Sequence, residues 1–182
     1  MKLIVLDRDG VINFDSPDYI KSAREWNPIP GSLEAIARLC HAGYRVAIAS
    51  NQSGIGRGLF TLDALFGIHD KMSRMVADFG GRIDAIAYCP HTPDDGCQCR
   101  KPLPGMLTDI GERLQYDLRG VPVVGDSWRD LQAAMAVKAT PMLVRTGNGR
   151  ETEQAHADEL KGITVHNDLA SLTDRLLQPA SH

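Results

Sequence analysis

The sequence has 182 residues, of which 43% are hydrophobic and 24% charged, as expected for one globular domain of roughly 150 residues or somewhat more. Its formal net charge of -3 argues against bulk electrostatic binding to nucleic acid or to an anionic membrane. No apolar run approaches the roughly 20 residues of a membrane span, and the apolar stretch that ends at Asp7 is too short for the core of a signal peptide. We therefore expect a cytoplasmic protein with no membrane or nucleic-acid partner, and a monomer because no apolar interface stripe is evident.

Short apolar runs alternate with helical patterns along the chain. Runs bounded by Gly, Pro or Asp predict buried strands at 3–6, 44–49, 83–88, 121–124, 141–144 and 163–165. Apolar residues at helical spacing predict helices around 33–40, 61–79, 106–114, 131–135 and 169–177. This alternation predicts an α/β fold with a mostly parallel sheet that helices cover on both faces.

The longest helical pattern is expected to begin after Thr61, which can cap it. Its apolar side chains are expected along one buried face: Leu62, Leu65, Phe66, His69, Met72, Val76 and Phe79. Two segments without regular periodicity, 13–30 and 90–103, lie between the elements. Loops of this length in a compact domain are usually functional.

Polar side chains follow four of the first five predicted strands. They are Asp7 and Asp9, Ser50 and Asn51, Cys89 and His91, and Gly125 with Asp126. Because ligands bind beyond the carboxyl ends of the strands in open parallel sheets, we expect these residues to gather at one edge of the sheet.

Acidic residues in this set predict a magnesium site. Asp7 and Asp9 are two residues apart at a strand end, so their carboxylates need a cation to relieve repulsion, and Asp126 ends another strand. Carboxylate oxygens are the protein ligands that Mg²⁺ takes. Asp130, about one helical turn later, either joins this site directly or is a favourable charge at a helix N-terminus.

Two segments are suited to anion binding. The stretch 50–56 is rich in hydroxyl, amide and glycine residues at a strand end, where backbone N–H groups can face an anion, although no Lys follows its glycines as in a P-loop. Arg100 and Lys101 directly follow Cys99. Cations fixed near a carboxylate–Mg²⁺ site suit a phosphate group.

Cys89, His91, Cys97 and Cys99 fall within eleven residues and predict a zinc site. Three thiols and one imidazole make a closed tetrahedral set, so we interpret it as a structural Zn²⁺ site. The alternatives are reduced surface cysteines or a disulfide within the loop.

In order and spacing, four strings resemble the four motifs of the haloacid dehalogenase-like phosphohydrolases: Leu6–Ile12, Ser50–Asn51, Lys101 and Gly125–Asp126. Cys97–Pro102 resembles the end of the zinc loop in their histidinol-phosphate and heptose-bisphosphate phosphatase branch, and Asn51–Gly58 is similar to the heptose-bisphosphate phosphatases. The resemblance covers roughly Lys2–Gly147. Val11 stands where the family more often has Thr, and the zinc loop is shorter than in some relatives.

The resemblance implies a Rossmann-like three-layer sandwich without a cap domain: a single domain, 1–182, with the zinc loop 89–99 inserted. It implies a hydrolase with an aspartyl-phosphate intermediate, in which Asp7 is the nucleophile and Asp9 the general acid and base. Mg²⁺ would lie between Asp7, the Asp9 carbonyl and Asp126, while Ser50 and Lys101 hold the phosphoryl oxygens. Candidate substrate-binding residues are Asp15, Tyr19, Asn51, Gln52, Ser53 and Arg100, the last for the distal part of the substrate.

The resemblance of Asn51–Gly58 favours hydrolysis of the C7 phosphate of D-glycero-D-manno-heptose 1,7-bisphosphate, in the biosynthesis of activated heptose for lipopolysaccharide. The first alternative is a histidinol-phosphate phosphatase or another small-molecule phosphatase. The second is a zinc-stabilised nucleic-acid-binding module, which requires a basic face with interspersed aromatic residues. The acidic net charge and the aromatic content of 5% disfavour that module and a polynucleotide 3′-phosphatase alike.

Overall fold

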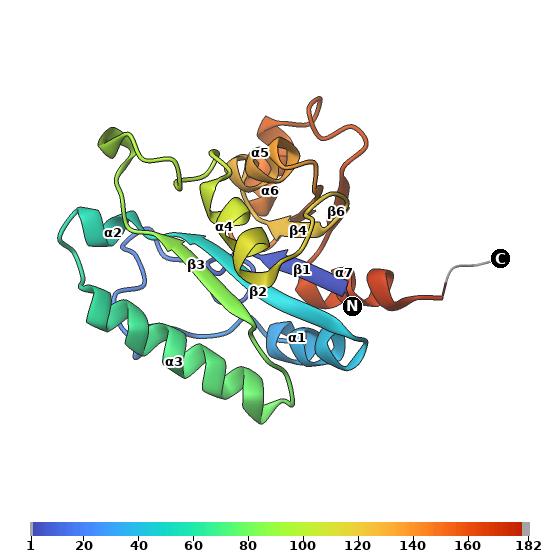
Figure 1. The fold of residues 1–182 in the computed structure, drawn as a ribbon, viewed down its shortest axis with the longest axis horizontal. Coiled ribbons are helices and arrows are strands. Elements are labelled where there is room, and N and C mark those ends of the chain that lie inside the picture. Colours follow the sequence, from blue (N-terminus) through green and yellow to red (C-terminus); the bar gives the residue numbers. More distant parts are fainter. Residues whose placement is uncertain (1, 180–182) are drawn as a thin grey trace.

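The computed structural model describes residues 2–179, so Met1 and residues 180–182 of the predicted domain lie outside the described residues. One six-stranded sheet runs in the order β3-β2-β1-β4-β5-β6, and every strand pair is parallel (Figure 1). The strands are β1 (Lys2–Leu6), β2 (Tyr44–Asn51), β3 (Ala85–Cys89), β4 (Pro122–Gly125), β5 (Thr140–Val144) and β6 (Thr164–His166). This order is that of the Rossmann-like sheet and confirms the predicted α/β class.

The five predicted helices form where the apolar spacing indicated, and three short helical elements occur in addition. They are α1 (Ser32–His41), α2 (Ser53–Gly56), α3 (Leu62–Asp78), α4 (Gly105–Leu114), α5 (Trp128–Ala136), α6 (Gly149–Ala155) and α7 (Leu169–Leu177), with one 3-10 turn, η1 (Pro93–Asp95). Thr61 is the N-cap of α3, since its hydroxyl accepts a hydrogen bond from the Ala64 N–H at 3.1 Å. The sequence did not predict α2, α6 or η1, because so few residues show no clear periodicity.

Alternating side chains along the strands build two separate layers of core. Ile4 and Leu6 of β1 pack with α1, α3 and α7 on one face, whereas Leu3 and Val5 pack with α4 and α5 on the other. Figure 1 shows these helices on opposite sides of the sheet. The three-layer sandwich therefore follows from strands that are apolar on both faces.

The predicted buried face of α3 is too wide. Leu65, Met72 and Val76 are fully buried, but Leu62, Phe66 and Phe79 are 42%, 50% and 45% exposed. A helix covering one face of a sheet buries only one stripe of its surface, and these three side chains lie outside that stripe.

The carboxyl ends of the strands carry the polar residues singled out above. Asp7 follows β1 and Asp126 follows β4, and these neighbouring strands lie at the point where the strand order reverses. Such a switch point is where open α/β sheets bind ligands. Within residues 2–179 no helix is long and apolar enough to cross a membrane.

Candidate active site

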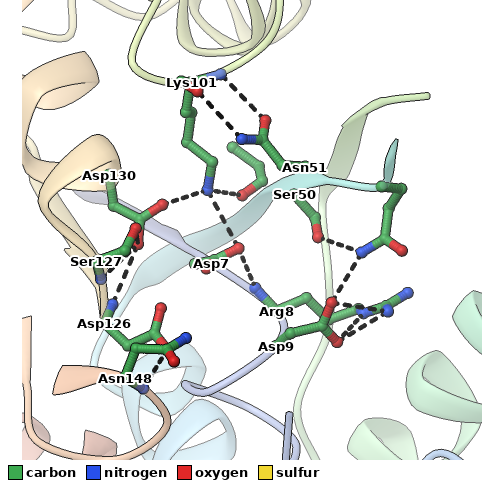
Figure 2. A network of polar contacts seen from close by, with 12 residues as sticks. Asp7, Arg8, Asp9, Ser50, Asn51, Lys101, Asp126, Ser127, Asp130 and Asn148 are labelled. Atoms are coloured by element: carbon green, nitrogen blue, oxygen red, sulfur yellow. Dashed lines mark hydrogen bonds and ion pairs between the residues drawn. The ribbon is translucent and has the colours of Figure 1, made fainter. Parts of the chain in front are cut away.

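Lys101 lies at the centre of the site and is almost fully buried (Figure 2). Its Nζ donates to Asp130 Oδ1 at 2.6 Å and to the Ala49 carbonyl at 2.8 Å, and it lies 3.1 Å from Asp7 Oδ1. Burial alone would lower the pKa of Lys101, but the carboxylates of Asp130 and Asp7 outweigh it and raise the pKa. The ammonium group therefore stays charged beside the end of β1.

Asp130 is the counterion of Lys101 and, as the third residue of α5, completes the capping box that begins at the N-cap residue Ser127. Its Oδ2 accepts hydrogen bonds from the backbone N–H groups of Asp126 and Ser127 and from the Ser127 hydroxyl, while Oδ1 faces Lys101. Burial raises the pKa of this carboxyl, but Lys101 more than compensates and the pKa is lowered. With both oxygens engaged, the geometry favours the helix-terminal role over direct metal ligation.

The donor set beside Lys101 fits a hard cation. Carboxylate oxygens of Asp7, Asp126 and Asp130 lie within 4.8 Å of one another. Burial raises the pKa of Asp7 to about 7, and burial together with Asp7 raises the pKa of Asp126 well above its ordinary value. Among the described residues, no donor contacts Asp7 Oδ2 or the Asp9 carbonyl, so both oxygens are free for a metal ion. Crowded carboxylates of this kind are stabilised by Mg²⁺.

Asp126 is held by a close-packed turn after β5. The backbone N–H of Asn148 donates to Asp126 Oδ2 at 2.8 Å, and its side-chain amide does so at 3.2 Å. Gly10 has a φ of 82°, and a Cβ there would collide with the Asp126 carboxylate. Gly147 has a φ of 57°, and a Cβ at this position would collide with the same carboxylate. Only glycine combines this backbone conformation with so close an approach.

Asp9 is paired with Arg8. The fully buried Arg8 guanidinium donates to both Asp9 oxygens, with distances from 2.8 to 3.1 Å, and Figure 2 shows the two groups facing each other. Asn13 and Gln52 add amide donors at 2.9 and 3.0 Å. Burial would raise the pKa of Asp9, but Arg8 and these amides lower it. These contacts favour the ionised form of Asp9, which can accept a proton.

Asn51, the last residue of β2, is hydrogen-bonded to the backbone of Lys101. Its side-chain amide donates to the Lys101 carbonyl at 3.2 Å and its oxygen accepts the Lys101 N–H at 3.0 Å. Ser50 is buried, and its hydroxyl accepts a hydrogen bond from Gln52 at 2.7 Å. Asn51 thus fixes the backbone that presents Lys101.

A cavity of about 90 Å³ opens above Asp7. It is lined by Asp7, Asp9, Asp15, Asn51, Lys101, Asp126, Ser127, Arg129, Asp130 and Asn148. Of the sequence candidates, Ser50, Gln52, Ser53 and Tyr19 are not among its lining residues; Ser53 is buried at the start of α2, and Tyr19 packs near Gly54. Arg100 lines a neighbouring pocket of about 570 Å³, together with Lys101, Arg129 and residues of the zinc loop.

The four predicted zinc ligands lie together. Four of the six distances among Cys89 Sγ, His91 Nδ1, Cys97 Sγ and Cys99 Sγ run from 3.1 to 3.7 Å, the four atoms all lie within 4.8 Å of one another, and all three cysteines are free thiols. Tetrahedral Zn²⁺ with Zn–S of about 2.3 Å places neighbouring ligand atoms roughly 3.5–3.8 Å apart. The cluster therefore fits zinc, whereas the alternative of a disulfide is contradicted.

Three residues of the site were missed by the sequence interpretation. Arg8 was overlooked between two aspartates, although a cation there is the obvious partner for one of them. Asn148 follows β5 in a Gly-Asn-Gly turn, so the rule of polar residues after strands could have found it. Arg129 carries no sequence signal beyond its place beside Asp130.

Two family models match the chain. One is described as polynucleotide kinase 3 phosphatase and matches residues 2–129, and the other is described as HAD-hydrolase-like and matches residues 98–172. Together with the sheet order and the acidic site at its switch point, these matches define the chain as an HAD-like phosphatase.

Relatives narrow the assignment. The D-glycero-β-D-manno-heptose-1,7-bisphosphate 7-phosphatase of Bordetella bronchiseptica is 57% identical over 99% of this chain and 100% of its own length, and that of Pseudomonas aeruginosa is 54% identical over 97% and 98%. A crystal structure of D,D-heptose 1,7-bisphosphate phosphatase from B. bronchiseptica, complexed with magnesium and phosphate, matches with a TM-score of 0.94 at 57% identity, covering 98% of this chain and 99% of that one. The chain belongs to this family of heptose-bisphosphate phosphatases, which confirms the resemblance found in its motifs.

Proposed function

We propose that this protein hydrolyses the C7 phosphate of D-glycero-β-D-manno-heptose 1,7-bisphosphate and releases heptose 1-phosphate and inorganic phosphate. The observation that carries the proposal is the Asp7 carboxylate, paired with buried Lys101 at the base of a small cavity, in a chain 57% identical to a named 7-phosphatase over nearly its full length. The sugar 1-phosphate would then serve the biosynthesis of activated heptose for lipopolysaccharide.

Asp7 attacks phosphorus in line, and the bond between phosphorus and the C7 oxygen breaks as the aspartyl-phosphate forms. Lys101 holds Asp7 Oδ1 in place and faces the cavity where negative charge develops on the phosphoryl oxygens. Ser50 acts indirectly: its hydroxyl accepts a hydrogen bond from the Gln52 side chain and so orients that amide toward Asp9. The covalent intermediate divides one difficult displacement into two.

Asp9 moves the protons. It gives a proton to the departing C7 oxygen and then takes one from the water that attacks the aspartyl-phosphate, which returns Asp7 to a free carboxylate and Asp9 to its protonated form. The second role matches the ionised state that Arg8 maintains. The first requires Asp9 to gain a proton, and a phosphate dianion entering the cavity raises the pKa of a neighbouring carboxyl in that direction.

Asp7, Asp126 and the Asp9 carbonyl would hold Mg²⁺, as their free oxygens and raised pKa values indicate. When bound, this ion neutralises charge on the transferring group. The cluster of Cys89, His91, Cys97 and Cys99 would hold a structural Zn²⁺ that fixes the segment leading to Arg100. We further propose a cytoplasmic monomer, on the sequence grounds given above.

The larger pocket beside the cavity supports a substrate with a second anionic group. Arg100 lies on its wall, and its pKa is lowered by burial and by repulsion from Arg129. A separate pocket of about 450 Å³ is lined by Asp15 and Phe14 among others, and its lining includes no Lys or Arg. A sugar bisphosphate therefore extends from Asp7 toward Arg100 rather than toward Asp15.

A second candidate is a polynucleotide 3′-phosphatase, which the match over residues 2–129 favours. The reaction at Asp7 would be the same, and only the leaving group would differ. The acidic net charge disfavours a long polyanionic substrate.

The test is a phosphatase panel of heptose 1,7-bisphosphate, histidinol phosphate, fructose 1,6-bisphosphate and a 3′-phosphorylated oligonucleotide. We expect the highest kcat/KM on the heptose bisphosphate. A higher value on any of the other three would contradict the proposed function.

A further inference from the structure

Arg129 is the second residue of α5 and lines both the cavity above Asp7 and the larger pocket beside it. Arg129 and Lys101 are the two residues that these two linings share. We propose that Arg129 is a specificity-determining residue which, with Arg100, holds the second phosphate of the substrate. This inference rests on the proposed function and names the residues that recognise the distal end.

Neither guanidinium is neutralised by the protein. Throughout residues 2–179 no carboxylate pairs with the side chain of Arg129 or Arg100; the one side-chain hydrogen bond of Arg100 reaches the His91 carbonyl at 3.4 Å, and the side chain of Arg129 makes none. The half-buried Arg145, by contrast, pairs with Glu153 at 2.7 Å. An unpaired cation on a pocket wall is available for an anionic ligand.

The location of Arg129 is unfavourable without such a ligand. The first turn of a helix carries positive partial charge, so a cation there is disfavoured and an acid is the stabilising choice. Arg129 also faces a second cation, because its charge repels Arg100. A phosphate dianion between the two guanidinium groups would relieve both effects through charge-assisted, bidentate hydrogen bonds.

The geometry assigns the pair to the distal phosphate rather than to the one transferred. Lys101 already serves the phosphoryl group at Asp7, and Arg100 lines only the larger pocket of the two. Since Arg129 lies at the boundary and interacts with Arg100, both can reach one anion in the larger pocket. The zinc loop, which also lines that pocket, fixes the backbone on the Arg100 side.

The test compares steady-state kinetics on heptose 1,7-bisphosphate and on heptose 7-phosphate, which lacks the second phosphate. We expect Arg129→Ala to lower kcat/KM on the bisphosphate by about 10-fold or more, chiefly through KM, and to change it less than about twofold on the monophosphate. Arg129→Lys should recover part of the loss. In Arg100→Ala/Arg129→Ala the combined loss should be smaller than the product of the single losses, because both side chains hold one group.

The matched control is Arg150→Ala. Arg150 is likewise exposed and is the second residue of a helix, α6, but it lines neither pocket. Arg150→Ala should leave kcat/KM unchanged on both substrates, and thermal melting should show that each variant is folded.

Two failures are distinguishable. If the wild-type enzyme does not hydrolyse heptose 1,7-bisphosphate, the proposed function fails and this assignment fails with it. If the wild type is active, equal losses on both substrates for Arg129→Ala would assign Arg129 to the transferred phosphate, and no loss on either would make it a solvated surface charge. Both results overturn the inference alone.

Discussion

The Lys101→Met substitution tests how far one buried ammonium group holds this site together. It keeps a flexible side chain of similar length but removes the charge that contacts Asp130 at 2.6 Å and Asp7 at 3.1 Å. Both partners stay behind in a buried setting. Removing one member of a buried ion pair destabilises proteins by about 3–5 kcal/mol, because an uncompensated charge remains. For a chain of this size that corresponds to a fall in Tm of roughly 6–20 °C.

The loss should depend on pH, and its sign follows from Asp130. In the wild type Lys101 holds the pKa of Asp130 low, so its contribution to stability is present above the unfolded pKa and is lost as the pH falls through the folded one. In the variant, burial without the cation raises that pKa, and protonation removes the penalty. The gap in Tm between variant and wild type should therefore be largest near pH 8 and narrow toward pH 4.

Thermal unfolding of both proteins at several pH values in the absence of added Mg²⁺ measures this gap. Lys161→Met is the control, since Lys161 pairs with Asp158 on the surface, where both side chains are at least 79% exposed. Exposed pairs contribute little, so its Tm should match the wild type at every pH. A Tm for Lys101→Met within about 2 °C of the wild type at pH 8, or a gap unchanged by pH, would refute the reasoning.

Three further predictions concern chemistry and metals. Asp7→Asn should reduce phosphate release at least about 1000-fold without lowering Tm, because the amide is nearly isosteric but a poor nucleophile; more than a tenth of the wild-type rate would contradict the covalent mechanism. Mg²⁺ affinity, measured by calorimetry, should fall as the pH drops below about 7, since burial raises the pKa of Asp7 to about 7 and the proton then competes with the metal. An affinity that does not change between pH 8 and pH 6 would argue against Asp7 as a ligand. Brief EDTA treatment should remove activity that Mg²⁺ restores while about one zinc per chain stays bound, because thiolates hold Zn²⁺ more tightly than carboxylates hold Mg²⁺; protein purified under reducing conditions without zinc would contradict a zinc site at Cys89.

Much of the fold could be predicted because strands buried on both faces leave a strong signal. Each of the six predicted strands appears within two residues of its expected start, and Thr61 caps α3 as expected. The polar residues after β1, β2, β3 and β4 gather at one edge because parallel strands all end there. The width of the buried stripe on α3 could not be predicted, since it depends on how the helix packs and not on which residues are apolar.

The site was predicted less completely, for a different physical reason. Motif spacing identified Asp7, Lys101 and Asp126, which come directly after predicted strands or in a distinctive string. It gave no information on how side chains pair, so the bidentate contact of Arg8 with Asp9 was missed. The position of Arg129 between two pockets depends on how α5 packs beside the zinc loop, which one residue in a sequence cannot reveal.

The most direct test of the account is a phosphorus NMR time course of heptose 1,7-bisphosphate with the Mg²⁺-loaded enzyme. The signals of the C1 and C7 phosphates are followed separately as inorganic phosphate appears. The account predicts that the C7 signal disappears while the C1 signal persists as heptose 1-phosphate. Loss of the C1 signal first, or loss of both at equal rates, would contradict a site that transfers the C7 phosphate at Asp7 and retains the other between Arg100 and Arg129.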